Sequence, residues 1–245
     1  MKNEESITTN RDIPYPYSID PDELVERYEK IYVSAIHDIL SHKLKDFSLK
    51  MGNTWLGRDI KCMTKELKRE VCAGFAFTIK WVSDPTEVRE PLLGERMLGS
   101  YFKNAILVVD TGCDNEAGYL GELNTNAMIR NSVRASVIDG GARDSGFVKQ
   151  MDFPVFCKFT TPIDAYPKRN LLGWQIPISI NDVTIEPWDM IVGDSDGVIV
   201  VPKAVVEEVL TRAESRRDFE DKTRELIQGG MSPEEAGKKM GADSL

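Results

Sequence analysis

One short stretch of the sequence combines a basic and an acidic side chain with two glycines. Arg143 and Asp144 follow Gly140 and Gly141, directly after an apolar segment that is expected to be a buried strand. Ligands of α/β proteins bind at the carboxyl ends of the strands. A guanidinium matches a carboxylate in geometry, and an aspartate offers the hard oxygen ligands that divalent metals prefer. The pair therefore points to a 2-keto acid bound together with a metal ion.

The same two residues also allow a structural interpretation, in which Asp144 caps the next helix and Arg143 forms a surface ion pair. A second segment favours chemistry, because 21 positions before Arg143 the chain carries Glu122 next to Gly121. A helix that starts there exposes amides near Leu123 and Asn124 to an anion. The structural alternative for Glu122 is a solvated carboxylate that interacts favourably with the helix dipole.

Alternating strand-like and helix-like segments position these residues. Short runs rich in β-branched and aromatic residues predict strands over residues 71–82, 105–110, 135–139 and 154–159. A helix is expected over residues 116–130, with an apolar stripe formed by Leu120, Leu123, Ala127 and Met128 or Ile129. Strand, helix and strand in this order form a crossover unit, which is typical of an α/β fold.

Both ends of the chain are predicted to be helical outside a polar arm, residues 1–19. Asp20, with Glu23 in a capping-box position, begins a helix that runs to about Leu40 with a break near Ser34. Towards the other end we expect a hairpin over 176–185, a hairpin with an acidic turn over 193–202, a long helix over 203–228 and a short helix from Ser232. Residues 20–245 are therefore expected to form a single domain.

Composition argues against several classes of function. A formal net charge of −9 disfavours a nucleic-acid partner, because phosphate binding needs a cationic surface. The four cysteines include no CxxC pair and the chain has only two histidines, which argues against a zinc site and for reduced thiols. Met1–Glu5 lacks the apolar stretch of a signal peptide, and no run approaches the roughly 18 apolar residues of a membrane span. We expect a cytoplasmic protein with no membrane partner.

Several segments together resemble the RraA-like family, which includes the 4-hydroxy-4-methyl-2-oxoglutarate and 4-carboxy-4-hydroxy-2-oxoadipate aldolases. The similarity spans about residues 23–230 and rests on the order of its motifs. These motifs are Glu122 followed by Arg143-Asp144, Val137–Gly140, Phe153–Phe156, Asp194–Pro202, Val33–Leu40 and Ala73–Thr78.

The resemblance implies a fold, an activity and an assembly. The fold would be an α/β αββα sandwich of the swivelling β/β/α type, with a long C-terminal helix. The activity would be that of a divalent-metal-dependent carbon–carbon lyase, an aldolase that cleaves a 4-hydroxy-2-keto acid to pyruvate and also decarboxylates oxaloacetate. The assembly would be a homotrimer or homohexamer with sites near the subunit interfaces.

The resemblance also implies roles for individual residues. Asp144 would ligate Mg²⁺ or Mn²⁺, and Glu122 would act through metal-bound water. Arg143 would hold the pyruvate portion and offset enolate charge, while the amides of Leu123 and Asn124 would meet the substrate carboxylate. Glu220 of the long helix is a candidate metal ligand for a neighbouring subunit.

Two positions depart from the family pattern. Phe147 stands where the aldolases often carry an acidic residue, and Trp188 rather than glycine precedes Asp189. Two alternatives therefore remain. One is a non-enzymatic regulator, similar to RraA, that binds ribonuclease machinery. The other is a lyase or hydratase that acts on another keto acid or sugar acid, because a fold does not fix its substrate.

Overall fold

The structure is a computed structural model that describes residues 8–9, 13–43, 53–64, 70–83, 97–166 and 168–241. The segment Met1–Glu5, which bears on the expected absence of a signal peptide, lies outside these residues. The helices are α1 Pro21–Tyr28, α2 Val33–Asp38, α4 Glu122–Arg130, α5 Ser145–Val148, α6 Val206–Gln228 and α7 Pro233–Met240. The strands are β1 Thr8–Thr9, β2 Lys61–Cys62, β3 Cys72–Ser83, β4 Ala105–Asp110, β5 Gly118–Leu120, β6 Ala135–Ala142, β7 Val155–Thr160, β8 Arg169–Trp174, β9 Ile178–Ile180, β10 Val183–Ile185, β11 Met190–Gly193 and β12 Val198–Val201.

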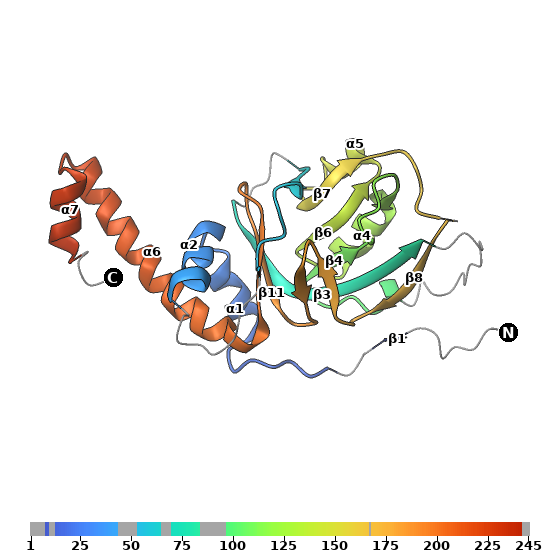
Figure 1. The fold of residues 1–245 in the computed structure, drawn as a ribbon, viewed down its shortest axis with the longest axis horizontal. Helices are drawn as coiled ribbons and strands as arrows, with labels where there is room; N and C mark the ends of the chain where they lie inside the picture. The colour runs from blue at the N-terminus through green and yellow to red at the C-terminus, as the bar shows by residue number, and fades with distance from the viewer. Residues whose placement is uncertain are drawn as a thin grey trace.

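A strongly curved, nearly closed sheet forms the body of the molecule (Figure 1). Its centre is the parallel set β3-β4-β6-β7, and β8 and β11 pair antiparallel with β3. Every residue of β4 and β6 is buried, as expected for parallel strands that are covered on both faces. The predicted α/β fold with a long C-terminal helix is therefore confirmed, and the four predicted strands correspond to this central set.

The β9–β10 hairpin packs its apolar side chains into the same core as β4, β6 and β12. Its two turn residues, Asn181 and Asp182, have φ angles of 48° and 64°. Positive φ at both central positions is the requirement of the two-residue turns that match strand twist, and Asn and Asp tolerate it. The predicted Asn-Asp hairpin is confirmed.

The crossover helix is shorter than the sequence pattern predicts. Residues Gly118–Leu120 form β5 beside β6, so α4 begins at Glu122 rather than near Glu116. The predicted apolar stripe is also wrong in part, because Thr125 and Met128 are the buried residues of α4 whereas Leu123 is 80% exposed. Periodicity does not reveal that a short edge strand precedes the helix.

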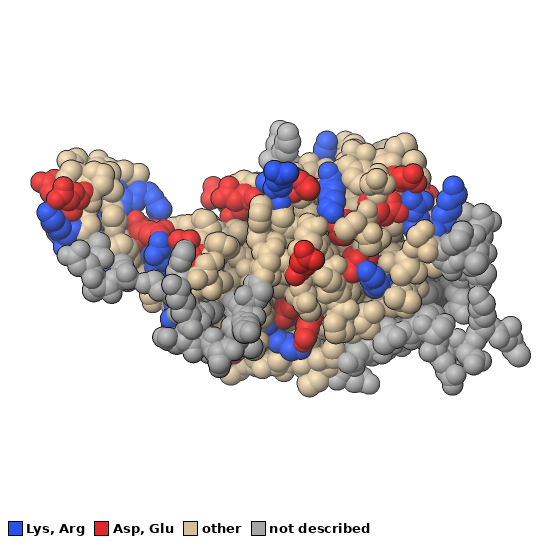
Figure 2. Space-filling model, viewed as in Figure 1, with Lys and Arg blue, Asp and Glu red and all other residues tan. Residues whose placement is uncertain are grey.

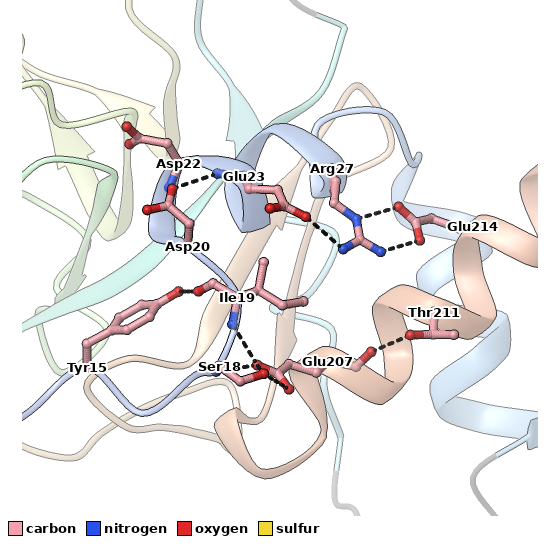
Figure 3. Close-up of polar contacts among 10 residues, drawn as sticks. All are labelled: Tyr15, Ser18, Ile19, Asp20, Asp22, Glu23, Arg27, Glu207, Thr211 and Glu214. Carbon is pink, nitrogen blue, oxygen red and sulfur yellow. Dashed lines mark hydrogen bonds and ion pairs between the residues drawn. The ribbon is translucent and has the colours of Figure 1, made fainter.

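Hydrogen bonds and ion pairs hold the N-terminal segment against α6 (Figure 3). Asp20 accepts hydrogen bonds from the amides of Asp22 and Glu23, which confirms it as the cap of α1. The side chain of Glu23 pairs with Arg27 instead of completing a capping box. Arg27 also makes two hydrogen bonds of 2.8 and 2.7 Å to Glu214 of α6.

The aromatic side chains of the arm are part of the core packing. Tyr15 and Tyr17 contact Phe75 of β3 with ring centroids 5.5 and 5.8 Å apart, and Tyr17 donates to the carbonyl of Trp188. The helix that was expected to break near Ser34 instead ends at Tyr28, and α2 starts at Val33. Residues 13–19 thus lie along the domain rather than projecting from it.

Helices α6 and α7 extend away from the sheet as a helical hairpin (Figure 1). The predicted glycine stop and capping box are confirmed: Gly230 has a φ of 96°, and Ser232 and Glu235 cap one another at the start of α7. Acidic and basic side chains are interspersed over the face shown in Figure 2. Within the described part of the chain, no helix combines the length and the apolar character needed to cross a membrane.

Candidate active site at the carboxyl end of β6

The side chain of Asp144 joins two helix starts that are far apart in the sequence. Asp144 follows β6 in a left-handed conformation with a φ of 51°, and its Oδ2 accepts a hydrogen bond of 3.1 Å from the amide of Glu122. It makes no capping hydrogen bond to α5, the helix that follows it. The structural alternative is therefore wrong in predicting that the Asp144 side chain caps the next helix, whereas the partly exposed ion pair that it predicted for Arg143 is present, with Asp164 as the partner. Asp144 caps α4 instead, and this contact brings the backbone of Glu122 next to Arg143 and Asp144, while the Glu122 carboxylate accepts from Asn126 at 3.4 Å.

Two glycines permit this approach. A Cβ atom at Gly121 would overlap Oδ2 of Asp144, and one at Gly118 would overlap Cγ of Arg143. The backbones also meet, because the amide of Arg143 donates to the carbonyl of Leu120 at 2.6 Å. Glycine is needed here for close packing against a neighbouring side chain.

The side chain of Arg143 pairs with a residue that sequence analysis did not identify. Its Nη1 forms an ion pair with Oδ2 of Asp164, while its Nε is buried and has no hydrogen-bond partner among the described residues. Asp164 lies beyond β7, where a β-bridge to Gly118 holds its backbone. The same rule that selected Arg143, a charge just past the carboxyl end of a parallel strand, could have found it.

The amides of Leu123 and Asn124 lie in the first turn of α4. Amides in the first turn of a helix have no carbonyl partner within the helix, and the helix dipole favours an anion there. Leu123 itself is 80% exposed and Phe147 of α5 is 63% exposed. The candidate site is thus bordered by exposed apolar side chains.

A row of paired charges supports the edge of the sheet beside this site. Lys80 and Asp110 are paired positions on β3 and β4, and Asp139 and Lys158 each follow the paired residues Ile138 and Cys157 of β6 and β7. Asp110 accepts from Lys80 at 2.6 Å and from the amide of Gly112 at 2.9 Å, and Asp139 pairs with Lys158. Burying these carboxylates requires such partners. The row fixes the loop that leads from β4 to β5.

The same loop is anchored by a buried ion pair. Arg169 Nε donates to Asp114 at 2.5 Å, and Tyr119 donates to the same carboxylate at 3.0 Å. Burial acts to raise the pKa of Asp114, but the hydrogen bond from Arg169, with further bonds from the amides of Ala117 and Glu116 and from Tyr119, lowers it to about 2. A cavity of about 390 Å³ opens beside this ion pair.

The lowered pKa of Asp114 predicts a loss of stability in acid. Because the folded-state pKa is below the ordinary value of 3.8, the charged form stabilises the fold above about pH 4, and this contribution is lost as the pH falls towards 2. We expect its loss to lower the free energy of unfolding by about 2 kcal/mol. Urea titrations of the wild type and Asp114→Asn between pH 5 and 2 measure it. Parallel curves for the two proteins across that range would contradict the prediction.

The other candidate residues lie elsewhere. Glu220 pairs with Arg216 at 2.9 Å and accepts from Tyr32, so its carboxylate has partners within its own chain. The Asp194–Asp196 turn lines a larger cavity, of about 860 Å³, at the opposite end of the sheet. Asp194 there accepts from the amide of Val33 at 2.9 Å, which ties the turn to α2.

The departure at Trp188 has a structural explanation. Trp188 has a φ of 74° and stacks on Phe102 with ring centroids 4.7 Å apart, next to Phe75. The buried Asp189 accepts from the amides of Glu186 and Lys203 at 2.8 Å each, and burial raises its pKa to about 6. This segment therefore anchors the core rather than the candidate site.

The charges of the site fit a divalent cation. Glu122, Asp144 and Asp164 carry three negative charges against the single positive charge of Arg143, so the group is net −2 at neutral pH. Among the described residues no cluster of three or more His, Cys, Asp or Glu side chains could hold a metal. Mg²⁺ needs no such cage, because it keeps several waters and binds through one or two carboxylates. Asp144, with Glu122 beside it, meets that requirement.

Comparison with known proteins identifies the family. The RraA-like model, Aldolase/RraA, matches residues 33–200, which is more than half of the chain. The chain belongs to the RraA-like family. The matched range includes Glu122, Arg143 and Asp144 and ends before α6.

Individual relatives carry different names. A protein of Halalkalibacterium halodurans named "Putative 4-hydroxy-4-methyl-2-oxoglutarate aldolase" is 36% identical over 120 residues, 49% of this chain and 56% of its own length. Protein DlpA of Legionella pneumophila is 30% identical over 134 residues, 55% of this chain and 22% of its own length. The chain thus matches less than two thirds of either relative.

Solved structures cover more of the chain. One described as "novel cellulases from microbes associated with the gut ecosystem" has a TM-score of 0.75 and 35% identity, covering 84% of this chain and 89% of that one. Streptomyces coelicolor RraAS2, described as "an unusual member of the RNase ES inhibitor RraA protein family", has a TM-score of 0.70 and 23% identity, covering 82% of this chain and 96% of its own. The second likeness shows the fold alone.

Proposed function

We propose that this protein is a divalent-metal-dependent lyase that cleaves a 4-hydroxy-2-keto acid to pyruvate and also decarboxylates oxaloacetate. One observation carries the proposal: the carboxylate of Asp144 accepts the amide hydrogen of Glu122 while Arg143 lies beside it. The cation of Arg143, the carboxylate of Asp144 and the N-terminus of α4, where Glu122 lies, thus meet at the end of one buried strand. The aldolase names among the relatives support the same reaction type.

Each residue of the site has a separate role in the proposed reaction, which follows from its charge. Arg143 binds the carboxylate of the pyruvate portion and offsets the negative charge that develops on the keto oxygen when the carbon–carbon bond breaks. The amides of Leu123 and Asn124 bind the same carboxylate from the start of α4. Glu122 positions a water molecule that takes the proton of the 4-hydroxyl as the carbon–carbon bond breaks and returns a proton to the methylene carbon of the pyruvate enolate.

Asp144 is the residue that would hold the metal ion, with Glu122 acting through water. Mg²⁺ or Mn²⁺, when bound, polarises the keto oxygen as a Lewis acid. Electrostatics support this assignment, because a doubly charged anionic substrate is repelled by a site of net charge −2 unless a cation is present. Glu220 of another subunit is a further candidate ligand.

We also propose that the protein acts in the cytoplasm as a homotrimer or homohexamer. Exposed apolar side chains on α4, on α5 and in the segment around Asp164 support an interface on these elements, since exposed apolar surface marks association sites. Leu123, Phe147, Ile163 and Tyr166 are its members. Sedimentation velocity of the wild type and Phe147→Glu tests this assembly, and a monomer at micromolar concentration would contradict it.

A pyruvate-release assay tests the activity. Purified protein is incubated with oxaloacetate or 4-hydroxy-4-methyl-2-oxoglutarate, and pyruvate is detected with and without excess chelator. We expect release that stops on chelation and returns when Mg²⁺ or Mn²⁺ is added. Pyruvate release equal to the spontaneous rate on both substrates would refute the proposal. Release of reducing sugar from carboxymethylcellulose, a soluble derivative of cellulose, is measured as a control for the other activity named among the similar structures.

A second candidate function is ribonuclease regulation, which the description of RraAS2 supports. It predicts inhibition of an RNase E-type enzyme that persists in Asp144→Ala, because such binding needs no metal. A lyase or hydratase acting on another keto or sugar acid remains the third candidate. It predicts chelator-sensitive turnover without pyruvate release.

A substitution at Gly121 tests the site without replacing any residue that is proposed as a ligand. In Gly121→Ala the new Cβ would overlap Oδ2 of Asp144, so the carboxylate must move away from the amide of Glu122. We expect Mn²⁺ affinity to fall by about tenfold, as for other changes that disturb the orientation of a ligand. Calorimetric titration with Mn²⁺ measures it. Gly146→Ala is the matched control, because a Cβ there meets nothing within 4 Å.

A further inference from the structure

Asp164 forms an ion pair with Arg143, the residue to which the proposed function assigns binding of the substrate carboxylate. Its Oδ2 contacts Nη1 of Arg143. Backbone hydrogen bonds hold the segment in this position, because the amide of Gly118 donates to the carbonyl of Ile163 at 2.9 Å and the amide of Ala165 donates to the carbonyl of Gly118 at 3.3 Å. Asp164 is thus held by hydrogen bonds on both sides. Its side chain is a carboxylate, the same group that a keto acid presents to a guanidinium.

Stability does not account for this ion pair. The side chain of Arg143 is 30% exposed and that of Asp164 is 56% exposed, and exposed ion pairs contribute little to folding. The buried pair Arg169–Asp114 differs in this respect, with both side chains at 10% exposure or less. The contact between Arg143 and Asp164 is therefore weak enough to exchange for a ligand.

We infer that Asp164 is an intramolecular competitor for the substrate, which pairs with Arg143 in the absence of ligand and must be displaced by the carboxylate of the ligand. The inference rests on the proposed function for the identity of that ligand. A simple carboxylate such as acetate gains only the contact with Arg143, so it competes with Asp164 on equal terms. A 2-keto acid also gains contacts at the Asp144 metal position and at the amides of α4, so it displaces Asp164. The competition therefore lowers the affinity of every carboxylate by a similar factor, and only a ligand with these further contacts, such as a chelating 2-keto acid, still binds appreciably.

Removal of the competing charge gives a gain of affinity, which a structural role for Asp164 would not produce. The probes are oxalate, a planar chelating dicarboxylate that resembles the enolate of pyruvate, and acetate. Their affinities are measured by calorimetry in excess Mg²⁺ for the wild type and Asp164→Asn. We expect both ligands to bind the variant about fivefold more tightly, with acetate binding becoming measurable.

Two controls isolate the residue. Asp182→Asn removes an exposed carboxylate from the β9–β10 turn and is expected to leave both affinities unchanged. Arg143→Lys/Asp164→Asn removes the planar guanidinium as well and is expected to lose the gain in affinity.

The outcomes separate this inference from the proposed function. If the wild type releases pyruvate and Asp164→Asn binds oxalate equally or more weakly, the inference is overturned and the function stands. If the wild type releases no pyruvate but Asp164→Asn binds oxalate more tightly, the inference stands and the function is wrong. Absence of oxalate binding in both proteins overturns the inference.

Discussion

Arg143→Ala and Asp144→Ala are each expected to lower kcat/KM for pyruvate release by about two to three orders of magnitude. The reason is electrostatic: in the proposed reaction both residues would offset the negative charge that develops on the keto oxygen, Arg143 directly and Asp144 through the cation that it would hold. Loss of either one leaves that charge without a preorganised partner. Steady-state kinetics with oxaloacetate in saturating Mg²⁺ measure the effect.

The two variants should differ in how they respond to metal. Asp144→Ala is expected to require far more Mn²⁺ for half-maximal activity, whereas Arg143→Ala is expected to keep its Mn²⁺ affinity and lose kcat/KM. Arg130→Ala is the matched control for the arginine, because it removes an exposed guanidinium from the far end of α4. A fall of less than fivefold in both site variants would show that this group is not the catalytic centre.

Arg169→Ala is expected to lower the free energy of unfolding by about 3–5 kcal/mol. The side chains of Arg169 and Asp114 are 9% and 10% exposed, so removal of the arginine leaves a buried carboxylate without its cation. Asp114 must then either stay charged in a largely buried position without its cation or take up a proton. Urea unfolding at pH 7, followed by tryptophan fluorescence, measures the change.

A double variant separates the effect of the two charges on stability from the effect of side-chain volume. Arg169→Met/Asp114→Asn keeps most of the volume and removes both charges, so it should recover much of the lost stability. Arg212→Ala, which disrupts an exposed pair with Glu208 on α6, should cost less than 1 kcal/mol. Equal losses in Arg169→Ala and Arg212→Ala would contradict a special role for the buried pair.

Stability and activity are connected through one loop. Asp114 and Tyr119 lie in the segment between β4 and α4, which also contains Gly118 and Gly121. Arg169 holds this segment from β8, and the segment in turn packs against Arg143 and Asp144. Conservative changes at Arg169 are therefore expected to reduce activity at denaturant concentrations where the fold is still intact.

The sequence alone determined the main elements and the choice of candidate site residues. The central strands, the Asn-Asp hairpin, the glycine stop after α6 and the capping box at Ser232 depend on local patterns, which residues within a few positions can specify. Arg143 and Asp144 could be selected because a charged pair directly follows a buried strand. Glu122, 21 positions before Arg143, completed the candidate group.

Only the tertiary structure decided which residues meet at the site. The capping of α4 by Asp144, the ion pair of Arg143 with Asp164 and the anchoring of the β4–β5 loop by Arg169 join residues that are 21 to 55 positions apart. Leu123 satisfied the helical pattern and yet is exposed, because β5 shifts the start of α4. Such contacts depend on how strands are ordered and how helices are oriented, and local periodicity and propensity contain no information on either.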